Sequence, residues 1–220
     1  MIYKVFTEEE TNTIINKLTY NKIFTDGKHS QQLSKIYNVK ENKESTIPEE
    51  LNKHIGKLLK NKRAIKTIYA PLKIKTRIYN SYSNNNFYDY HVDSFQSSDS
   101  KMLYNYGFSI SLTDDYEGGD FVLQTEAGEI GYKVGKGEVV IFPIIYPHKV
   151  MPITKGCRQN IIGWFESKVT YEQSYILKTL QEIVKTNTDV VKSNSENKTA
   201  KSLLIKSGLV QNYLVTKWGY

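Results

Sequence analysis

A histidine and a carboxylate lie two residues apart in the stretch Tyr-Asp-Tyr-His-Val-Asp-Ser-Phe, at positions 88–95. Side chains at i and i+2 of a β-strand point to the same face of a sheet, so His91 and Asp93 would present an imidazole and a carboxylate side by side. Such a pair can bind a metal ion, act as an acid and a base, or have no chemical role. The rest of the chain must distinguish these three interpretations.

A second histidine and an arginine favour the metal. His148 lies in the stretch IYPHKVMPI, directly before a predicted strand, and Arg158 follows ten residues later, after a turn at 154–156. If the two flanking strands form a hairpin, His148 and Arg158 lie near each other, and residues 158, 160, 162 and 164 share one face. A buried arginine requires an anionic partner. That partner is either an Asp or Glu of the protein or the carboxylate of a bound cosubstrate, which a guanidinium binds through two hydrogen bonds.

His91, Asp93 and His148 together match the ligand set of a mononuclear iron centre. Two histidines and one carboxylate occupy one face of the metal and leave three positions open, as in non-haem Fe(II) oxygenases. A structural zinc site would instead be closed by a fourth ligand. No fourth ligand is obvious in the sequence, because Cys157 is expected on the opposite face of its strand from Arg158.

The segments around these residues have the pattern of a mainly β core. Between about residues 72 and 167, short segments rich in β-branched and aromatic residues alternate with turn sequences such as EGGD (117–120) and GKGE (135–138). Their spacing predicts a β-sandwich or barrel and not an alternation of strands and helices.

Helices are predicted on both sides of this core. Thr7 and Glu10 fit a capping box and Pro48 marks the first turn of a second helix, whereas residues 21–45 are polar and carry few structural signals. After residue 168, apolar residues again recur at helical spacing around a loop at 193–199. We therefore expect an N-terminal helical support (1–70), a β core (71–168) and a C-terminal helical extension (169–220), packed as one compact unit whose helices buttress one sheet.

Composition limits the cellular context and the partners. The chain has 220 residues, and its 39% hydrophobic and 24% charged residues are typical of a globular protein. It contains no apolar run long enough for a membrane span, its start lacks the apolar segment of a signal peptide, and Cys157 is the only cysteine. We expect a cytoplasmic protein without a membrane partner. The net charge of +7 suits an acidic partner, but the basic residues are scattered and do not favour nucleic acid.

The sequence resembles the Fe(II)/2-oxoglutarate-dependent dioxygenases, and within them the prolyl-4-hydroxylase-like branch. The resemblance is carried by the HxD pair, the distal histidine, the basic residue ten positions after it, and the stretch from Arg77-Ile-Tyr to Tyr88. The stretches LTDDYEGGDFVL (112–123), GKGEVVIFP, PHKVMPITKGCR and YLVTKW are similar to the bacterial PKHD-type hydroxylase group. The chain departs from the family between Tyr79 and Tyr88, where Ser and Asn replace the usual glycines, and after Asp93, where Ser-Phe replaces Asn-Ala.

The resemblance implies a fold, a set of cofactors and a role for each site residue. It implies a double-stranded β-helix (jelly-roll) catalytic core with N-terminal and C-terminal α-helices. His91, Asp93 and His148 would bind Fe(II), Arg158 would bind the distal carboxylate of 2-oxoglutarate, and Tyr79 would donate a hydrogen bond to that carboxylate. O₂ would be the second cosubstrate and ascorbate the reductant. The reaction would be hydroxylation of a C–H bond, foremost prolyl 4-hydroxylation of a protein or peptide, with succinate and CO₂ as coproducts.

Two other functions remain open from the sequence. One is oxidative demethylation of nucleic acid, although dioxygenases of that kind usually carry a second arginine six residues after the first, where this chain has Trp164. The other is a metal-binding β-helix module without turnover, serving as a sensor or scaffold. A homodimer is a further expectation, because Leu203, Leu209, Leu214 and Trp218 can serve either the core or an interface.

Overall fold

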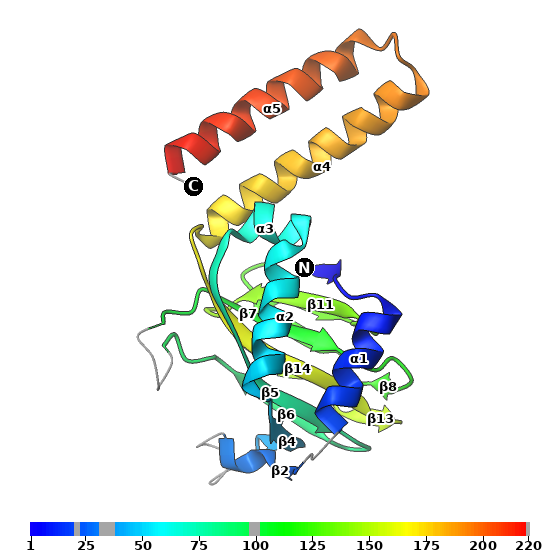
Figure 1. Cartoon of the computed structure of the whole chain (residues 1–220), viewed down its shortest axis with the longest axis vertical. Helices are drawn as coiled ribbons and strands as arrows, with labels where there is room; N and C mark the ends of the chain where they lie inside the picture. The colour runs from blue at the N-terminus through cyan, green and yellow to red at the C-terminus, as the bar shows by residue number, and fades with distance from the viewer. Residues whose placement is uncertain (20–22, 31–37, 97–101, 219–220) are drawn as a thin grey trace.

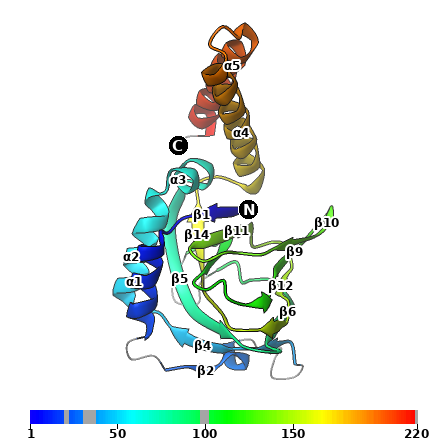
Figure 2. The ribbon, with the colours of Figure 1, turned by 90° about the vertical axis from the view of Figure 1, so that its right-hand side faces the viewer.

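Two antiparallel β-sheets face each other at the centre of the molecule, and helices cover the outer face of one of them (Figures 1 and 2). The structure is a computed structural model that describes residues 1–19, 23–30, 38–96 and 102–218. Its helices are α1 (Glu8–Thr19), α2 (Glu49–Asn61), α3 (Arg63–Tyr69), α4 (Tyr171–Ser193), α5 (Lys198–Trp218) and the short 3-10 helix η1 (Gly27–Ser30). This arrangement confirms the predicted mainly β core with flanking helices.

The strands of the described residues fall into a larger sheet, a smaller sheet and one isolated pair. Across the larger sheet the order is β1 (Ile2–Lys4), β11 (Glu138–Pro143), β7 (Tyr106–Ser111), β14 (Arg158–Ser167), β5 (Pro71–Tyr82), β4 (Lys43–Thr46) and β2 (Thr25–Asp26). Across the smaller sheet it is β10 (Gly128–Tyr132), β9 (Phe121–Thr125), β12 (His148–Val150), β6 (Phe87–His91) and β3 (Lys40–Glu41). The isolated pair is β13 (Ile153–Lys155) with β8 (Glu117–Gly118).

Helices α1 and α2 pack on the outer face of the larger sheet (Figure 2). The predicted capping box starts α1: the Thr7 amide donates to Glu10 Oε2 (2.8 Å), and the Glu10 amide donates to Thr7 Oγ1 (3.1 Å). Apolar side chains of helices and sheet form the main core, which includes Ile14, Leu18, Leu51, Ile55, Leu59, Tyr79, Ile110, Ile161 and Phe165. Because side chains alternate along a strand, the remaining side chains of β5 and β14 face the smaller sheet.

The N-terminal segment, which was expected to be a helical support, contributes strands as well as helices. Strand β1 pairs with β11 at one edge of the larger sheet. Strand β3 pairs with β6 in the smaller sheet, and β4, only two residues further on, pairs with β5 in the larger one. Residues 38–46 therefore cross from one sheet to the other. These strands are too short and too polar to show a period-2 pattern, and residues 20–22 and 31–37 of the same stretch lie outside the described residues.

The predicted hairpin between His148 and Arg158 does not form. The expected single strand after His148 is divided at Pro152 into β12 and β13, and β13 pairs with β8. Proline has no N–H to donate to a ladder, which explains the break. Since β12 belongs to the smaller sheet and β14 to the larger one, His148 and Arg158 face the space between the sheets from opposite sides.

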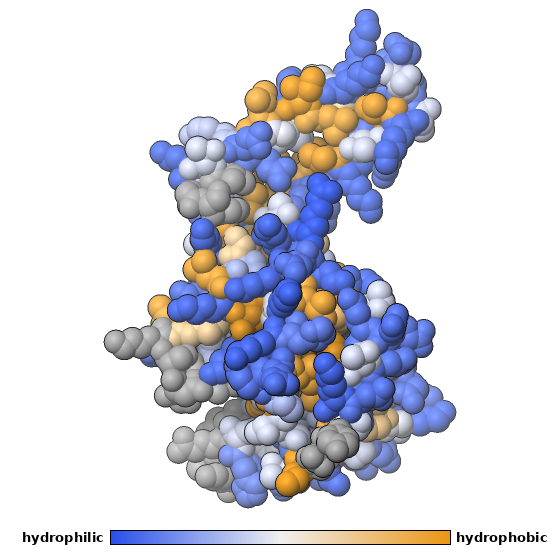
Figure 3. Space-filling model, in the orientation of Figure 1, coloured by the Kyte–Doolittle hydropathy of each residue, from blue (hydrophilic) through white to orange (hydrophobic). Residues whose placement is uncertain are grey.

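Helices α4 and α5 form a hairpin that extends away from the sheets (Figure 1), so they do not buttress a sheet as expected. The base of α4 is tied to β7, where the Tyr106 hydroxyl donates to Ser174 Oγ (2.9 Å). Figure 3 shows hydrophobic surface along this hairpin. The exposed large side chains of α4 and α5 are Tyr175, Ile176, Ile183, Leu203, Ile205, Leu209, Val210 and Tyr213. In the described part of the chain, no helix combines the length and the apolar composition that crossing a bilayer requires.

Candidate active site

A cavity of about 500 Å³ lies between the two sheets. Its polar lining comes from both walls and includes Asn80, Tyr82, Tyr88, His91, Asp93, His148, Arg158 and Asn160. Its apolar lining includes Phe108, Phe121, Phe142, Val150, Ile162 and Trp164. A volume of this size, mostly apolar with a few converging polar groups, is typical of small-molecule sites.

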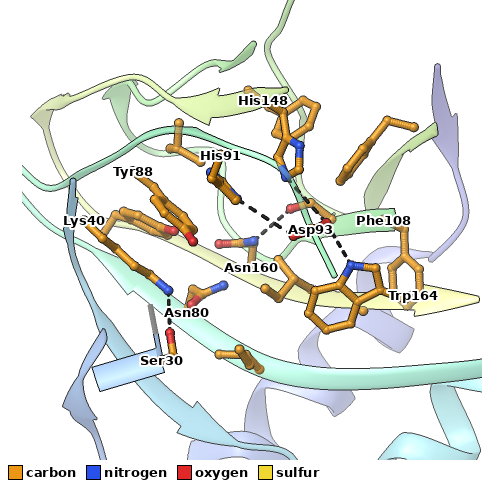
Figure 4. A pocket seen from close by; sticks show the side chains of 18 of the residues that line it. Ser30, Lys40, Asn80, Tyr88, His91, Asp93, Phe108, His148, Asn160 and Trp164 are labelled. Atoms are coloured by element: carbon orange, nitrogen blue, oxygen red, sulfur yellow. Dashed lines mark hydrogen bonds and ion pairs between the residues drawn. The ribbon is translucent and has the colours of Figure 1, made fainter. Parts of the chain in front are cut away.

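His91, Asp93 and His148 converge at one point of this cavity (Figure 4). His91 ends β6 and His148 begins β12, and the two are direct neighbours across these antiparallel strands. His91 Nε2 lies 4.0 Å from Asp93 Oδ1, and His148 Nε2 lies 3.6 Å from Asp93 Oδ2. Two ligand atoms at right angles, each about 2.1 Å from one ion, lie about 3 Å apart, so a small inward movement would let all three bind one metal.

The hydrogen bonds of the two imidazoles leave the nitrogens that face Asp93 able to bind a metal. His91 Nδ1 lies 2.9 Å from the Asp89 carbonyl oxygen, and His148 Nδ1 lies 3.1 Å from the Tyr146 carbonyl oxygen. A carbonyl oxygen only accepts, so each Nδ1 carries the proton and each Nε2 presents a lone pair. Burial lowers the pKa of His91 to about 3, which keeps its ring neutral at physiological pH. Two imidazoles and one carboxylate fit Fe(II) with open coordination positions.

Trp164 holds the Asp93 carboxylate from the opposite sheet. Its indole Nε1 donates a hydrogen bond of 2.8 Å to Asp93 Oδ2 (Figure 4). The indole also stacks on Tyr104, with ring centroids 5.5 Å apart. This bond restricts the carboxylate to the side of the cavity where the histidines lie. The sequence predicts Trp164 on the same face of its strand as Arg158, but no local pattern indicates its hydrogen bond to Asp93.

Arg158 is the largest fully buried side chain among the described residues, with 1% of its surface exposed. Its Nη1 donates to Asn160 Oδ1 (2.9 Å), and its guanidinium carbon lies 5.4 Å from the centre of the Tyr82 ring. Among the residues that the structure describes, no carboxylate forms an ion pair with it. Gly119 has a φ of +66°, and a Cβ there would lie 2.3 Å from Ile153 Cδ1 and 3.2 Å from Arg158 Cδ, so the glycine leaves room for both side chains. A buried guanidinium that borders a cavity and forms no ion pair with a described carboxylate fits a carboxylate of a ligand.

Tyr79 does not reach the cavity, which corrects the role that the resemblance implied for it. It lies on the helix-covered face of β5, in the main core, and its hydroxyl donates to Gln159 Oε1 (2.8 Å). Burial raises its pKa to about 12. Tyr82 lies three residues after Tyr79, so it is on the opposite face of β5 and borders the cavity beside Arg158. Strict alternation along β5, which places residues 78, 80 and 82 on one face, was the signal that could have found Tyr82.

The sequences of known proteins decide the family. Residues 78–166 match the 2OG-Fe(II) oxygenase superfamily. Over 174 residues the chain is 35% identical to a PKHD-type hydroxylase of Prochlorococcus marinus (strain AS9601). The aligned region covers 76% of this chain and 77% of the relative. The chain belongs to the PKHD-type hydroxylases. A member from Alteromonas mediterranea is 32% identical over 161 residues, covering 68% of this chain and 70% of that protein. The chain is thus an enzyme of the 2OG-Fe(II) oxygenases, whose reaction uses Fe(II), 2-oxoglutarate and O₂.

Solved structures share the fold of this family member. A Pseudomonas putida prolyl-4-hydroxylase superposes with a TM-score of 0.58 at 14% identity, covering 76% of this chain and 91% of that chain. A Trichoplax adhaerens prolyl hydroxylase was solved with a peptide fragment of the hypoxia inducible factor oxygen degradation domain. It superposes with a TM-score of 0.58 at 15% identity, covering 80% of this chain and 85% of that chain. These likenesses confirm the jelly-roll core.

Proposed function

We propose that this chain hydroxylates C4 of prolyl residues in a protein or peptide, with succinate and CO₂ as coproducts. The observation that carries the proposal is the convergence of two imidazoles and a carboxylate in a cavity that also holds the buried guanidinium of Arg158. The substrate class is supported by the two solved neighbours, which are prolyl hydroxylases, one of them bound to a peptide.

In this proposal the residues of the chain position the reactants. His91, Asp93 and His148 would hold Fe(II), which together with 2-oxoglutarate and O₂ supplies the oxidising chemistry when bound. Arg158 would bind the distal carboxylate of 2-oxoglutarate through charge-assisted hydrogen bonds, and the neighbouring Tyr82 would take the part expected of Tyr79. The three ligands would thus set the iron at one end of the cosubstrate and the guanidinium would fix the other.

The apolar lining has a part in the same reaction. Phe108, Phe121, Phe142 and Val150 border the cavity and limit the water in it. Electrostatic interactions are stronger in such surroundings, so the guanidinium discriminates more sharply for an anionic ligand. We further propose ascorbate as the reductant that returns oxidised iron to Fe(II).

We also propose a homodimer formed through the α4–α5 hairpin. Support comes from the large apolar side chains that this hairpin exposes, which include Ile205, Leu209 and Tyr213 on successive turns of α5. Light scattering of the purified protein should give twice the chain mass, and Leu209→Lys with Tyr213→Lys should give a monomer with an unchanged melting temperature. A monomeric natural chain at micromolar concentration would contradict this.

The reaction is tested with proline peptides that carry two deuterium atoms at C4. With Fe(II), ascorbate and 2-oxoglutarate, we expect the peptide to lose one deuterium and gain one oxygen, with an equal amount of succinate. His91→Ala should give neither product. Succinate with a methylated oligonucleotide but not with any proline peptide would favour demethylation. Iron binding without succinate from either substrate would favour the binding module.

A further inference from the structure

Lys40 is a buried cation beside the proposed metal site that the proposed mechanism does not use. It lies where residues 38–46 cross between the sheets, borders the cavity, and is 2% exposed. Its Nζ donates to Ser30 Oγ (2.8 Å) and forms an ion pair with Glu44. The Glu44 carboxylate offsets the charge of Lys40, so the ammonium can lie beside a metal site without repelling a divalent cation strongly.

The ammonium of Lys40 also lies over the ring of Tyr88, 4.4 Å from its centre. The two residues are direct neighbours across β3 and β6. Tyr88 in turn stacks on His91, with ring centroids 3.6 Å apart and planes 9° from parallel. Because the imidazole covers one face of the Tyr88 ring at this distance, the ammonium must approach from the other side, as Figure 4 shows.

A bulge in β6 makes this stack. Across β12 the partners are His148 with His91 and Val150 with Tyr88, so one residue of β12 between these pairs opposes two residues of β6. Tyr88 and His91, three residues apart, therefore point to the same side. The hydrogen bond from His91 Nδ1 to the Asp89 carbonyl fixes one point of the imidazole, and the stack on Tyr88 fixes its plane.

We propose that Lys40 is a positioning residue for the metal ligand His91 and that it acts through Tyr88. The inference rests on the proposed metal site. The cation–π contact holds the Tyr88 ring, and the Tyr88 ring holds the imidazole in the orientation that directs Nε2 toward Asp93. An N-terminal segment remote in sequence from the HxD pair thereby sets the geometry of the metal site.

The chain offers a matched control on the solvent side of β6, the strand that contains Tyr88. Lys149 lies over the Tyr90 ring at 4.3 Å and pairs with Glu129 at 3.4 Å, and the Tyr90 hydroxyl donates to Glu129. This group has the same composition of lysine, tyrosine and glutamate. Tyr90 is 37% exposed and makes no stack with a proposed metal ligand, so its loss should leave the metal site unchanged.

The test is calorimetric titration of the metal-free full chain with Mn(II). The variant is Lys40→Met with Glu44→Gln, so that no buried carboxylate is left unpaired. We expect a Mn(II) affinity about tenfold weaker, the lower end of what partners of metal ligands contribute. Lys40→Arg, which keeps a cation over the ring, should stay within about twofold. The control, Lys149→Met with Glu129→Gln, should match the natural chain.

A second measurement asks whether Lys40 acts through Tyr88. In a Tyr88→Leu background, the Lys40→Met and Glu44→Gln changes should weaken Mn(II) binding by no more than about a further twofold. Tyr88→Leu alone also tests the stack on His91 if the Lys40 variant fails to fold. In Co(II)-loaded protein, the proton NMR signal of the His91 Nδ1–H should shift in the Lys40 variant, and that of His148 should not.

Unchanged Mn(II) affinity in the Lys40 variant, an equal loss in the Lys149 control, or a full additional loss in the Tyr88→Leu background would each overturn the inference. A failure of the metal site itself is recognised separately. In that case the natural chain and His91→Ala would bind Mn(II) equally, whatever stands at position 40.

Discussion

Replacing Arg158 by Met should have opposite effects on the ligand-free protein and on 2-oxoglutarate binding. The side chain is 1% exposed, and no carboxylate among the described residues pairs with it. Burying a charge without an ionic partner costs free energy in the ligand-free protein, and Met removes that cost while keeping most of the side-chain volume. The same change removes the only proposed cationic anchor for the distal carboxylate of 2-oxoglutarate and leaves the hydroxyl of Tyr82.

The size of the effect follows from the burial of this charge. Truncating one partner of a buried, hydrogen-bonded charge pair costs about 2 to 5 kcal/mol of binding, which is about 30- to 4,000-fold in affinity. At a concentration of about 100 times its dissociation constant, a ligand stabilises the natural fold by about 2.7 kcal/mol. For a chain of 220 residues this raises the melting temperature by about 5 to 11 °C. In Arg158→Met the same concentration should raise it by at most about 4 °C.

The assay is thermal unfolding of the Mn(II)-loaded protein without O₂, with and without 2-oxoglutarate. Arg63→Met is the control, because Arg63 is exposed at the start of α3. It should keep the full ligand-induced shift. The reasoning is refuted if Arg158→Met keeps the full shift as well. It is also refuted if ligand-free Arg158→Met melts well below the natural chain, because that would make Arg158 a structural residue.

Three further outcomes follow from the site. Trp164→Phe keeps an aromatic ring but loses the 2.8 Å bond to Asp93, so metal affinity should fall about 10- to 100-fold, and an unchanged titration would mean that the bond does not position the carboxylate. Tyr82→Phe should raise the KM for 2-oxoglutarate, whereas Tyr79→Phe should leave it unchanged and lower stability by about 1 kcal/mol through the lost bond to Gln159; the reverse pattern would restore Tyr79 to the site. With free metal ion at about 100 times its dissociation constant, removal of the metal by a chelator should lower the melting temperature of the protein by about 5 to 11 °C. A chelator without effect would argue against a resident metal.

The three proposed metal ligands and the arginine could be found in the sequence because each stands in a strong local context. The HxD spacing and the strand before Asp93 fix the relation of the first two ligands. Arg158 begins a strand rich in β-branched and aromatic residues, and the alternation along β14 placed Arg158 and Trp164 on one face. The larger elements were also predictable, since capping signals and apolar periodicity are local properties.

Other features depend on contacts that no local pattern reports. Tyr79 and Tyr82 lie on opposite faces of the same strand, and only the position of the helices decides which face is the cavity. The strands around Asn42 are held by pairing with β5 and β6, not by their own polar sequence. The stack of Tyr88 on His91 requires a bulge, which shifts the alternation by one residue.

The central claim is that His91, Asp93 and His148 hold an iron whose open positions accept 2-oxoglutarate. The most direct measurement is anaerobic titration with Fe(II) and 2-oxoglutarate, followed by the visible absorption band that a 2-oxo acid gives when it chelates Fe(II). We predict a band that saturates at one Fe(II) per chain and is lost in His91→Ala and in His148→Ala. A natural chain without the band, or either variant with the full band, would contradict the claim.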